Sequence, residues 1–309
     1  MKTNYFTLFV KGIAMGTANV IPGVSGGTIA LITGIYERLI NAIKSFNIKA
    51  LKLLLQFKFK EFAKHTDLVF LVPLMLGLVF AVLSLAKIFA YLFAEYPVYI
   101  WAYFFGLVLA SVYFVGKTVE RWNTAAILSF IIGAAIAIAV SIIHPAAENS
   151  SPFYVFINGV IAIVSMILPG LSGSFVLILL GNYQLIAINA INNFDLSIII
   201  PFALGAGIGL VLFSHFLSWL FKSYKNQTIA LLTGFILGSL GVLWPWKNPV
   251  YLLSSDGATV VKHGKKVIQY YDKTLPQDYG LSFYFAVALM LIGVLSIFWI
   301  EKYSATQEN

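Results

Sequence analysis

The sequence has few charged residues and no cysteine. Only 10% of its 309 residues are Asp, Glu, Lys or Arg, whereas about a quarter of a soluble domain is charged. Too few polar side chains are present to cover a soluble exterior, which excludes soluble enzymes, nucleic-acid-binding proteins and secreted disulfide-rich proteins. The lack of cysteine also excludes disulfides, thiolate metal sites and cysteine nucleophiles.

Motifs for nucleotides and metals are missing too. No Walker-type phosphate loop occurs, so ATP is not expected to drive the protein directly. The four histidines show no metal-binding spacing such as His-Glu-x-x-His. We therefore expect no metal and no cofactor. The net charge of +8 is not a sign of nucleic acid here, because in a membrane protein the position of the charges matters more than their sum.

Long apolar stretches dominate what is present. The mean hydropathy is +0.90, and a helix needs roughly 20 mostly apolar residues to cross about 30 Å of hydrocarbon. The six tryptophans fall near the ends of these stretches, where membrane interfaces lie. The sequence predicts an all-α polytopic membrane protein with apolar segments at 4–21, 26–46, 69–93, 99–116, 125–143, 153–168, 173–193, 198–221, 228–246 and 281–301.

The chain contains an internal repeat. IPGVSGGT at 21–28 recurs as LPGLSGSF at 168–175, 147 residues later. A second block repeats after 128 residues, matching for example Asp67 with Asp195 and Pro73 with Pro201. The two offsets differ because about 20 residues, 47–66, are inserted in the first half. The repeat predicts two units, 1–146 and 147–309.

Each unit is predicted to be a re-entrant helical hairpin followed by three transmembrane helices. The hairpins cover about 4–46 and 153–193. The spans are 69–93, 99–116 and 125–143 in the first unit, and 198–221, 228–246 and 281–301 in the second, with an outer flap or hairpin at 247–280. Because each unit crosses the membrane an odd number of times, the two repeats should have inverted topology.

The basic residues support this topology. With both termini in the cytoplasm, most Lys and Arg residues fall on the cytoplasmic side, whereas the outer connections near 94–98, 144–152 and 194–197 have none. The insertion 47–66 mixes apolar residues with five lysines. It is predicted to form a helix that lies on the cytoplasmic leaflet against anionic phospholipid, although a solvated basic linker is the alternative.

The repeated Pro-Gly-x-Ser-Gly turn is the main candidate site. Proline ends one helix, and serine is a favoured N-cap for the next. Backbone N–H groups at a helix start suit phosphate or carboxylate. The candidate binding residues are Ser25, Gly26, Gly27 and Thr28 in the first turn and Ser172, Gly173 and Ser174 in the second. The alternative is a plain tight turn, with glycine for close packing.

Charged residues within the apolar segments are further candidates. Lys11 and Lys87 could bind an anion or could extend to the nearest interface. His215 occupies the repeat position of Lys87 and could instead be a packed histidine. Glu37 and Arg38 follow Gly34-Ile35-Tyr36, and they are either an interfacial ion pair or a gate in contact with a headgroup.

Two motifs point to a family. MGTANVIPGVSGGTIALITGIYERL at 15–39 and ILPGLSGSFVLILLGNYQL at 167–185 resemble the bacterial polyprenyl-phosphate transporter (PopT) family over essentially the whole chain. The resemblance implies a flippase in the bacterial cytoplasmic (inner) membrane that returns undecaprenyl phosphate to the cytoplasmic leaflet for cell-envelope synthesis. Asn19 departs from the family pattern, which has an acidic residue there, and this leaves a role in proton coupling at Asn19 in doubt.

A transporter of this kind must move only the headgroup, because the prenyl tail can stay in lipid. Burying a lone phosphate in hydrocarbon costs tens of kcal/mol by Born estimates, so a polar path is required. We expect the two turns to cradle the phosphate, with added positive charge from Lys11, Lys87 or Arg38. Residues that could serve coupling or gating are Glu37, His215 and Asn19.

Two other functions stay open at this point. The undecaprenyl-diphosphate phosphatases also have inverted repeats and a Pro-Gly-x-Ser turn, but there an arginine follows the serine. Here Gly26 and Gly173 follow it, so the charge of the transferring phosphoryl group would lack stabilisation. A small-anion channel or exchanger could use the same helix N-termini. We expect a transporter rather than an enzyme.

Overall fold

The computed structural model describes residues 4–20, 25–143, 145–251, 261–262, 265–266 and 268–308. Residues 1–146, the predicted first unit, contain eight described α-helices. They are α1 (Tyr5–Val20), α2 (Gly26–Ile32), α3 (Tyr36–Lys44), α4 (Ile48–Leu55), α5 (Phe59–His65), α6 (Leu68–Glu95), α7 (Pro97–Lys117) and α8 (Thr124–Ile142). The second unit has α9 (Pro152–Ile167), α10 (Gly173–Leu179), a π-helix η1 (Gln184–Ala190), α11 (Leu196–Ser223), α12 (Lys225–Ser239) and α13 (Leu281–Glu308).

The helical content confirms an all-α polytopic membrane protein. Five helices in the described part of the chain are long and apolar enough to cross a membrane: α6, α7, α8, α11 and α13. Their starts follow from capping chemistry, since Pro97 occupies the first turn of α7 and Asn123 accepts a hydrogen bond from the Ala126 N–H at the start of α8.

Close helix crossings repeat between the units. A side chain at Gly12 of α1 would strike the Leu74 carbonyl of α6, and one at Gly77 would strike the Phe9 carbonyl of α1. The α9–α11 crossing has the same pair of contacts at the repeat positions, from Gly159 to Phe202 and from Gly205 to Phe156. Only glycine allows backbones to approach this closely, so the repeated glycines fix these crossings.

The remaining long helices pair between the units. Gly106 of α7 and Gly293 of α13 face each other's backbones, and Gly234 of α12 and Gly133 of α8 do the same. Helix α7 of the first unit therefore packs with the last helix of the second, while α12 of the second packs with α8 of the first. These pairings between the units place residues of both in one hydrophobic core cluster.

The structure divides several segments that the sequence predicted as continuous. The predicted arm 26–46 is broken into α2 and α3 at Gly34 (φ +71°), and 173–193 into α10 and η1 at Gly181 (φ +76°). The predicted span 228–246 ends as a helix at Ser239, since Pro245 disfavours helix at Trp244. The insertion forms two helices, α4 and α5, instead of one.

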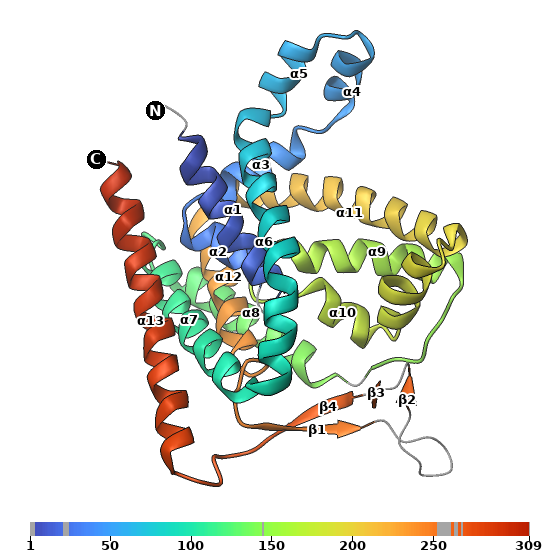
Figure 1. Ribbon diagram of the computed structural model, residues 1–309. Coiled ribbons are helices and arrows are strands. Elements are labelled where there is room, and N and C mark those ends of the chain that lie inside the picture. Colours follow the sequence, from blue (N-terminus) through green and yellow to red (C-terminus); the bar gives the residue numbers. More distant parts are fainter. Residues whose placement is uncertain are drawn as a thin grey trace.

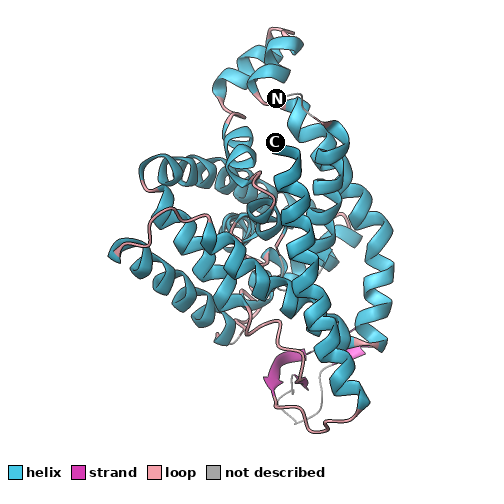
Figure 2. Ribbon diagram, turned by 90° about the vertical axis from the view of Figure 1, so that its left-hand side faces the viewer, coloured by secondary structure: helices cyan, strands magenta, loops and turns pink. Residues whose placement is uncertain are grey.

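Two ends of the molecule differ in structure. Helices α4 and α5 stand at one end, and both chain ends lie toward it, whereas strands β1 (Lys247–Tyr251) and β4 (Ile268–Lys273) form an antiparallel ribbon at the other (Figures 1 and 2). The short strands β2 (Val261–Lys262) and β3 (Lys265–Lys266) pair beside it. Helices α1, α6 and α13 run along the line between the ends, while α9 and α11 lie across it (Figure 1).

Candidate functional site

The first turn is held by hydrogen bonds within the protein. Ser25 caps α2: its Oγ accepts the Gly27 N–H at 3.0 Å and donates to the Met166 carbonyl at 3.0 Å. The Gly26 N–H donates to Asn19 Oδ1 at 2.7 Å. The N–H groups of Gly26 and Gly27 are therefore already occupied. The Pro22-Gly23 part of this motif lies outside the described residues.

The first turn also bonds directly to the second. The Gly170 N–H donates to Thr28 Oγ1 at 3.1 Å, and the Tyr36 hydroxyl donates to the Ile167 carbonyl at 3.0 Å. Ser25 and Thr28 are almost completely buried, at 2% and 1% exposed. The structure thus brings the two sequence motifs together, with Ser25 and Thr28 at the joint between them.

The second turn is more open. Ser172 begins α10 but its side chain caps no N–H; its Oγ lies 2.8 Å from the Ser174 Oγ. Within the described part of the chain the Gly173 and Ser174 N–H groups have no hydrogen-bond partner. Ser174 is exposed. The exposed Ser174 can therefore offer its hydroxyl and N–H to a ligand here, with the half-buried Ser172 hydroxyl beside it, whereas Gly173 is buried.

Two amide side chains in the second half of the chain, one buried and one half-buried, have buried polar atoms without partners, and the sequence analysis missed them. Asn158 of α9 is 0% exposed, and neither its Oδ1 nor its Nδ2 has a hydrogen bond; Gln184 Oε1 in η1 has none either. An unpaired buried polar group costs about 1–3 kcal/mol. The 147-residue offset of the repeat could have indicated these residues, because it pairs Asn158 with Lys11 and Gln184 with Glu37.

Lys11 lies at the far end of α2 from Ser25. Its Nζ donates to the Thr33 carbonyl at 2.8 Å, and Thr33 is the C-cap of α2. Seven helical residues span about 10 Å, which separates Lys11 from the first turn. A cation at a helix C-terminus stabilises the helix through its dipole. The structure therefore gives Lys11 a contact with α2 and does not bring it to Ser25.

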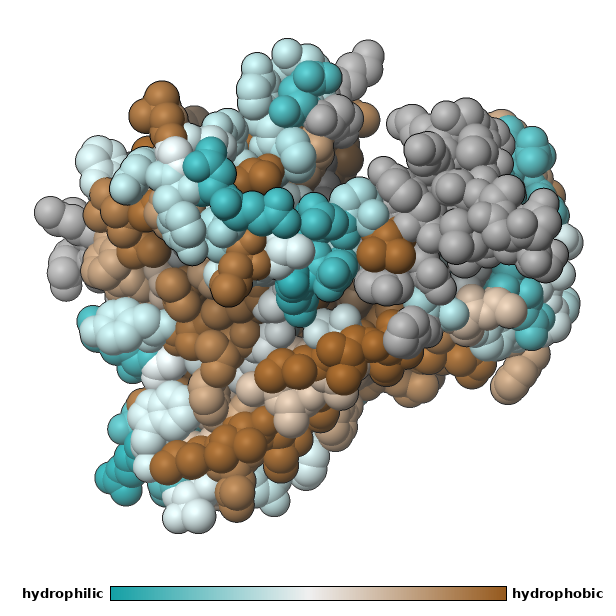
Figure 3. Space-filling view, turned by 90° about the horizontal axis from the view of Figure 1, so that it is seen from below, coloured by the Kyte–Doolittle hydropathy of each residue, from teal (hydrophilic) through white to brown (hydrophobic). Residues whose placement is uncertain are grey.

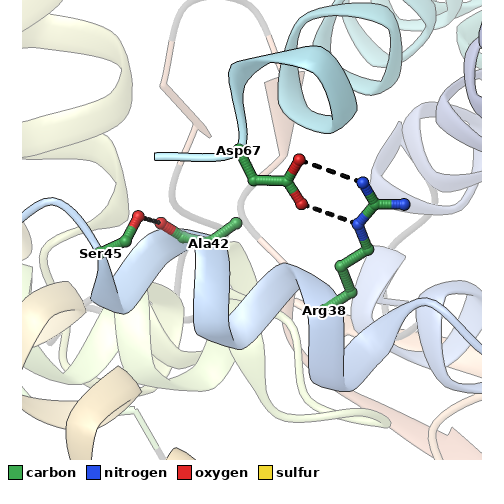
Figure 4. A network of polar contacts seen from close by, with 4 residues as sticks. All are labelled: Arg38, Ala42, Ser45 and Asp67. Atoms are coloured by element: carbon green, nitrogen blue, oxygen red, sulfur yellow. Dashed lines mark hydrogen bonds and ion pairs between the residues drawn. The ribbon is translucent and has the colours of Figure 1, made fainter. Parts of the chain in front are cut away.

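Arg38 is paired with a carboxylate (Figure 4). Its Nε and Nη2 donate to the two Asp67 oxygens at 2.7 and 3.0 Å, and its guanidinium lies 4.4 Å from the Phe70 ring centre. Arg38 and Asp67 border an open cavity of about 550 Å³, which is also lined by Gly34, Glu37, Asn41, Ala42, Ser45 and His65. Glu37 is thus close to Arg38 but forms no ion pair in the described structure.

The remaining candidates lie apart from these groups. His215 is exposed on α11, where its Nδ1 lies 2.8 Å from the Val211 carbonyl of its own helix. Lys87 is on α6, and its side chain is outside the described part of the structure. No cluster of His, Asp or Glu that could hold a metal occurs among the described residues.

These features define a class: a polytopic helical membrane protein with a repeated polar turn inside the bundle. Comparison with known proteins identifies the family. Sequences of the undecaprenyl phosphate translocase-like family match residues 15–260. A polyprenyl-phosphate transporter of Vibrio cholerae is 38% identical over 302 residues, which cover 97% of each chain. One from Staphylococcus aureus is 30% identical over 253 residues, covering 76% of this chain and 85% of the relative.

The chain therefore belongs to the undecaprenyl phosphate translocase-like family. This confirms the resemblance seen in the two turn motifs. The names of the family and of both relatives are those of transporters and not of enzymes, in agreement with the expectation from the missing arginine after each serine. No solved structure matches the chain.

Proposed function

We propose that this protein transports undecaprenyl or another polyprenyl phosphate from the outer to the cytoplasmic leaflet of the bacterial inner membrane. The single observation that carries the proposal is family membership across nearly the whole chain. The product would be the carrier lipid returned for another round of cell-envelope synthesis. A prenyl tail can remain in lipid, so the protein has to supply a polar path for the phosphate alone.

The proposed orientation places α4 and α5 in the cytoplasm, with both termini on the same side. Five lysines of the 47–66 insertion support this assignment. The exposed apolar side chains of the insertion would enter the headgroup region of anionic phospholipid; they are Ile48, Leu51, Leu54, Leu55, Phe57 and Phe59. The paired glycine contacts support two repeated units, which in this proposal have inverted topology and rock against each other.

The proposed headgroup site is the junction of the two turns. Ser172 and Ser174 would donate to the phosphate first, because Ser174 is exposed and the Ser172 hydroxyl lies beside it. The Gly173 N–H has no partner in the described structure but is buried, so it would donate only after the turn opens. Ser25, Gly26, Gly27 and Thr28 would hold the site in shape, since their polar groups bind the protein itself. Lys11, Lys87 and Arg38 would add positive potential along the path, and Glu37, His215 and Asn19 are the candidates for coupling or gating.

The test uses purified protein in liposomes that contain labelled undecaprenyl phosphate, with leaflet exchange and phosphate release measured together. The expected result is exchange without release, at a rate that falls at least about tenfold in Ser172→Leu, since a hydrogen bond to a charged group is worth about 1.5–3 kcal/mol. Ser223→Leu, an exposed serine in the last turn of α11, is the matched control. Release of phosphate from the diphosphate lipid would favour an enzyme, and conduction of small anions without lipid exchange would favour a channel.

A further inference from the structure

The ribbon of β1 and β4 carries a lysine into an aromatic environment. Lys247 Nζ donates to the Val242 carbonyl at 2.6 Å, just beyond the end of α12. The same ammonium lies 3.4 Å from the ring centre of Trp101 on α7 and 5.0 Å from that of Tyr271 on β4. Lys247 is thus held against α7, β4 and the turn that follows α12. Strand β1, which Lys247 begins, lies at the end of the molecule opposite α4 and α5 (Figure 1).

A second lysine lies directly across the ribbon. Lys273 is the cross-strand partner of Lys247, so both side chains are on one face. The Lys273 ammonium lies beside Gly241, 3.0 Å from where a Cβ on that glycine would be, and Gly241 precedes Val242, whose carbonyl Lys247 binds. The next pair, Asn248 and Asp272, is on the opposite face, so the Asp272 carboxylate does not neutralise the two lysines.

The two ammonium groups lack a counter-charge. Neither forms an ion pair with any described residue, and like charges directly opposite in a ribbon are destabilising. Burial and the charge of Lys273 lower the pKa of Lys247 to about 7, while the Val242 carbonyl and the Trp101 face oppose this by favouring the ammonium form. An anion between the lysines would turn this repulsion into attraction.

The geometry leaves room for such an anion. An ammonium has three N–H donors, and Lys247 uses one of them for Val242. Lys273 is exposed, so the pair is accessible from solution. Viewed from this end, a band of hydrophilic residues runs between hydrophobic patches (Figure 3). Trp246, Trp244 and Phe283 form a run of contacting rings next to the ribbon.

We propose that Lys247 and Lys273 form a phosphate-binding site at the end of the molecule opposite α4 and α5. The ligand class is a phosphate monoester or free phosphate, bound between two ammonium groups. If the transport direction proposed above is right, this end faces outward, and the site receives the headgroup of polyprenyl phosphate before it moves to the turns. In that respect the inference rests on the proposed function.

The test measures how fast Lys247 reacts with an amine-acetylating reagent at pH 7.5, by mass spectrometry of the full-length protein in nanodiscs. Only the neutral amine reacts. At pH 7.5, a bound anion that raises the pKa of Lys247 by one unit from about 7 therefore slows its acetylation about threefold. Exposed Lys117, at the end of α7, is the internal reference. One arm compares inorganic phosphate with chloride at the same ionic strength. The other arm compares nanodiscs with and without undecaprenyl phosphate.

Protection of Lys247 in either arm, lost in Lys273→Ala, supports the site. Protection by undecaprenyl phosphate alone identifies a site for the lipid headgroup. Protection by inorganic phosphate alone identifies a site for free phosphate. Equal acetylation rates with and without both probes would overturn the proposal. Lys262→Ala removes one charge from the same segment and should retain the protection.

Transport in liposomes separates this inference from the proposed function. Lys273→Ala should lower exchange at low lipid concentration, whereas the control Lys262→Ala should retain it. Normal exchange in Lys273→Ala together with no protection would reject the site and leave the transporter intact. Absence of exchange in the wild-type protein would reject the transporter, and the inorganic phosphate arm would then decide the site by itself.

Discussion

The two turns have closely related sequences but offer different groups to a ligand. In the first, Asn19, Ser25 and Thr28 bind backbone groups of the protein. In the second, Ser172 pairs only with Ser174, and the N–H groups that begin α10 are free of partners in the described structure. Equivalent residues therefore serve unlike tasks: the first turn joins the units, and the second is the one with polar groups to spare.

The same contrast continues away from the turns. Where the first unit has Lys11 and Glu37, the second has the neutral amides Asn158 and Gln184. Lys11 has a carbonyl partner, while Asn158 is buried without one. Lys11 of the first unit thus has a partner, whereas Asn158 at the corresponding place in the second unit is a buried polar group without one. Such asymmetry suits a protein whose ligand enters one unit and is supported by the other.

Ser25→Leu should have the largest effect. Overpacking at this buried position costs about 1–3 kcal/mol, and loss of the cap adds about 1 kcal/mol. The thermal midpoint of unfolding should fall and transport should be lost with it.

Ser174→Leu, at the exposed serine of the second turn, should lower transport while the midpoint stays within about 2 °C, because surface substitutions cost little. Equal losses of stability in both variants would remove the contrast between the turns.

Asn158→Leu should have the next largest effect, and it should raise the free energy of unfolding instead of lowering it. Replacing an unpaired buried amide by an apolar side chain of similar size removes a penalty of about 1–3 kcal/mol. The variant should therefore resist unfolding better than the wild-type protein in urea or on heating. Reduced transport in this more stable variant would mean that the amide serves the ligand. A less stable variant would show that Asn158 has a partner, such as buried water, and would contradict the interpretation.

Asn19→Ala should have the smallest effect. It removes the acceptor of the Gly26 N–H, and loss of a cap of this kind costs about 0.5–2 kcal/mol. Asn19→Asp keeps an acceptor there and should keep the stability, which thermal unfolding of both variants can compare. If the alanine variant is as stable as the aspartate variant, the Asn19–Gly26 bond contributes nothing to the first turn.

Much of the architecture could be predicted from the sequence, because apolar length and glycine spacing are local properties. The predicted spans 69–93 and 99–116 correspond to α6 and α7, within a few residues. The breaks at Gly34 and Gly181 were visible only as matching glycines, and their left-handed conformation ends each arm early. The site was harder to predict. The motif marks Ser25 and Ser172 alike, but Ser25 binds Met166, 141 positions away, whereas Ser172 pairs only with Ser174, two positions along.

The sequence by itself determined the membrane class and the family, since hydropathy and the two turn motifs are local properties of the chain. Tertiary structure decided which polar groups remain open, because a hydrogen bond such as Ser25 to Met166 depends on two distant segments meeting. It also decided the pairing of Lys247 with Lys273 next to Trp101, which strand register and helix packing create together. Charge and hydrogen bonding act over a few ångströms in space, and distance along the chain does not predict them.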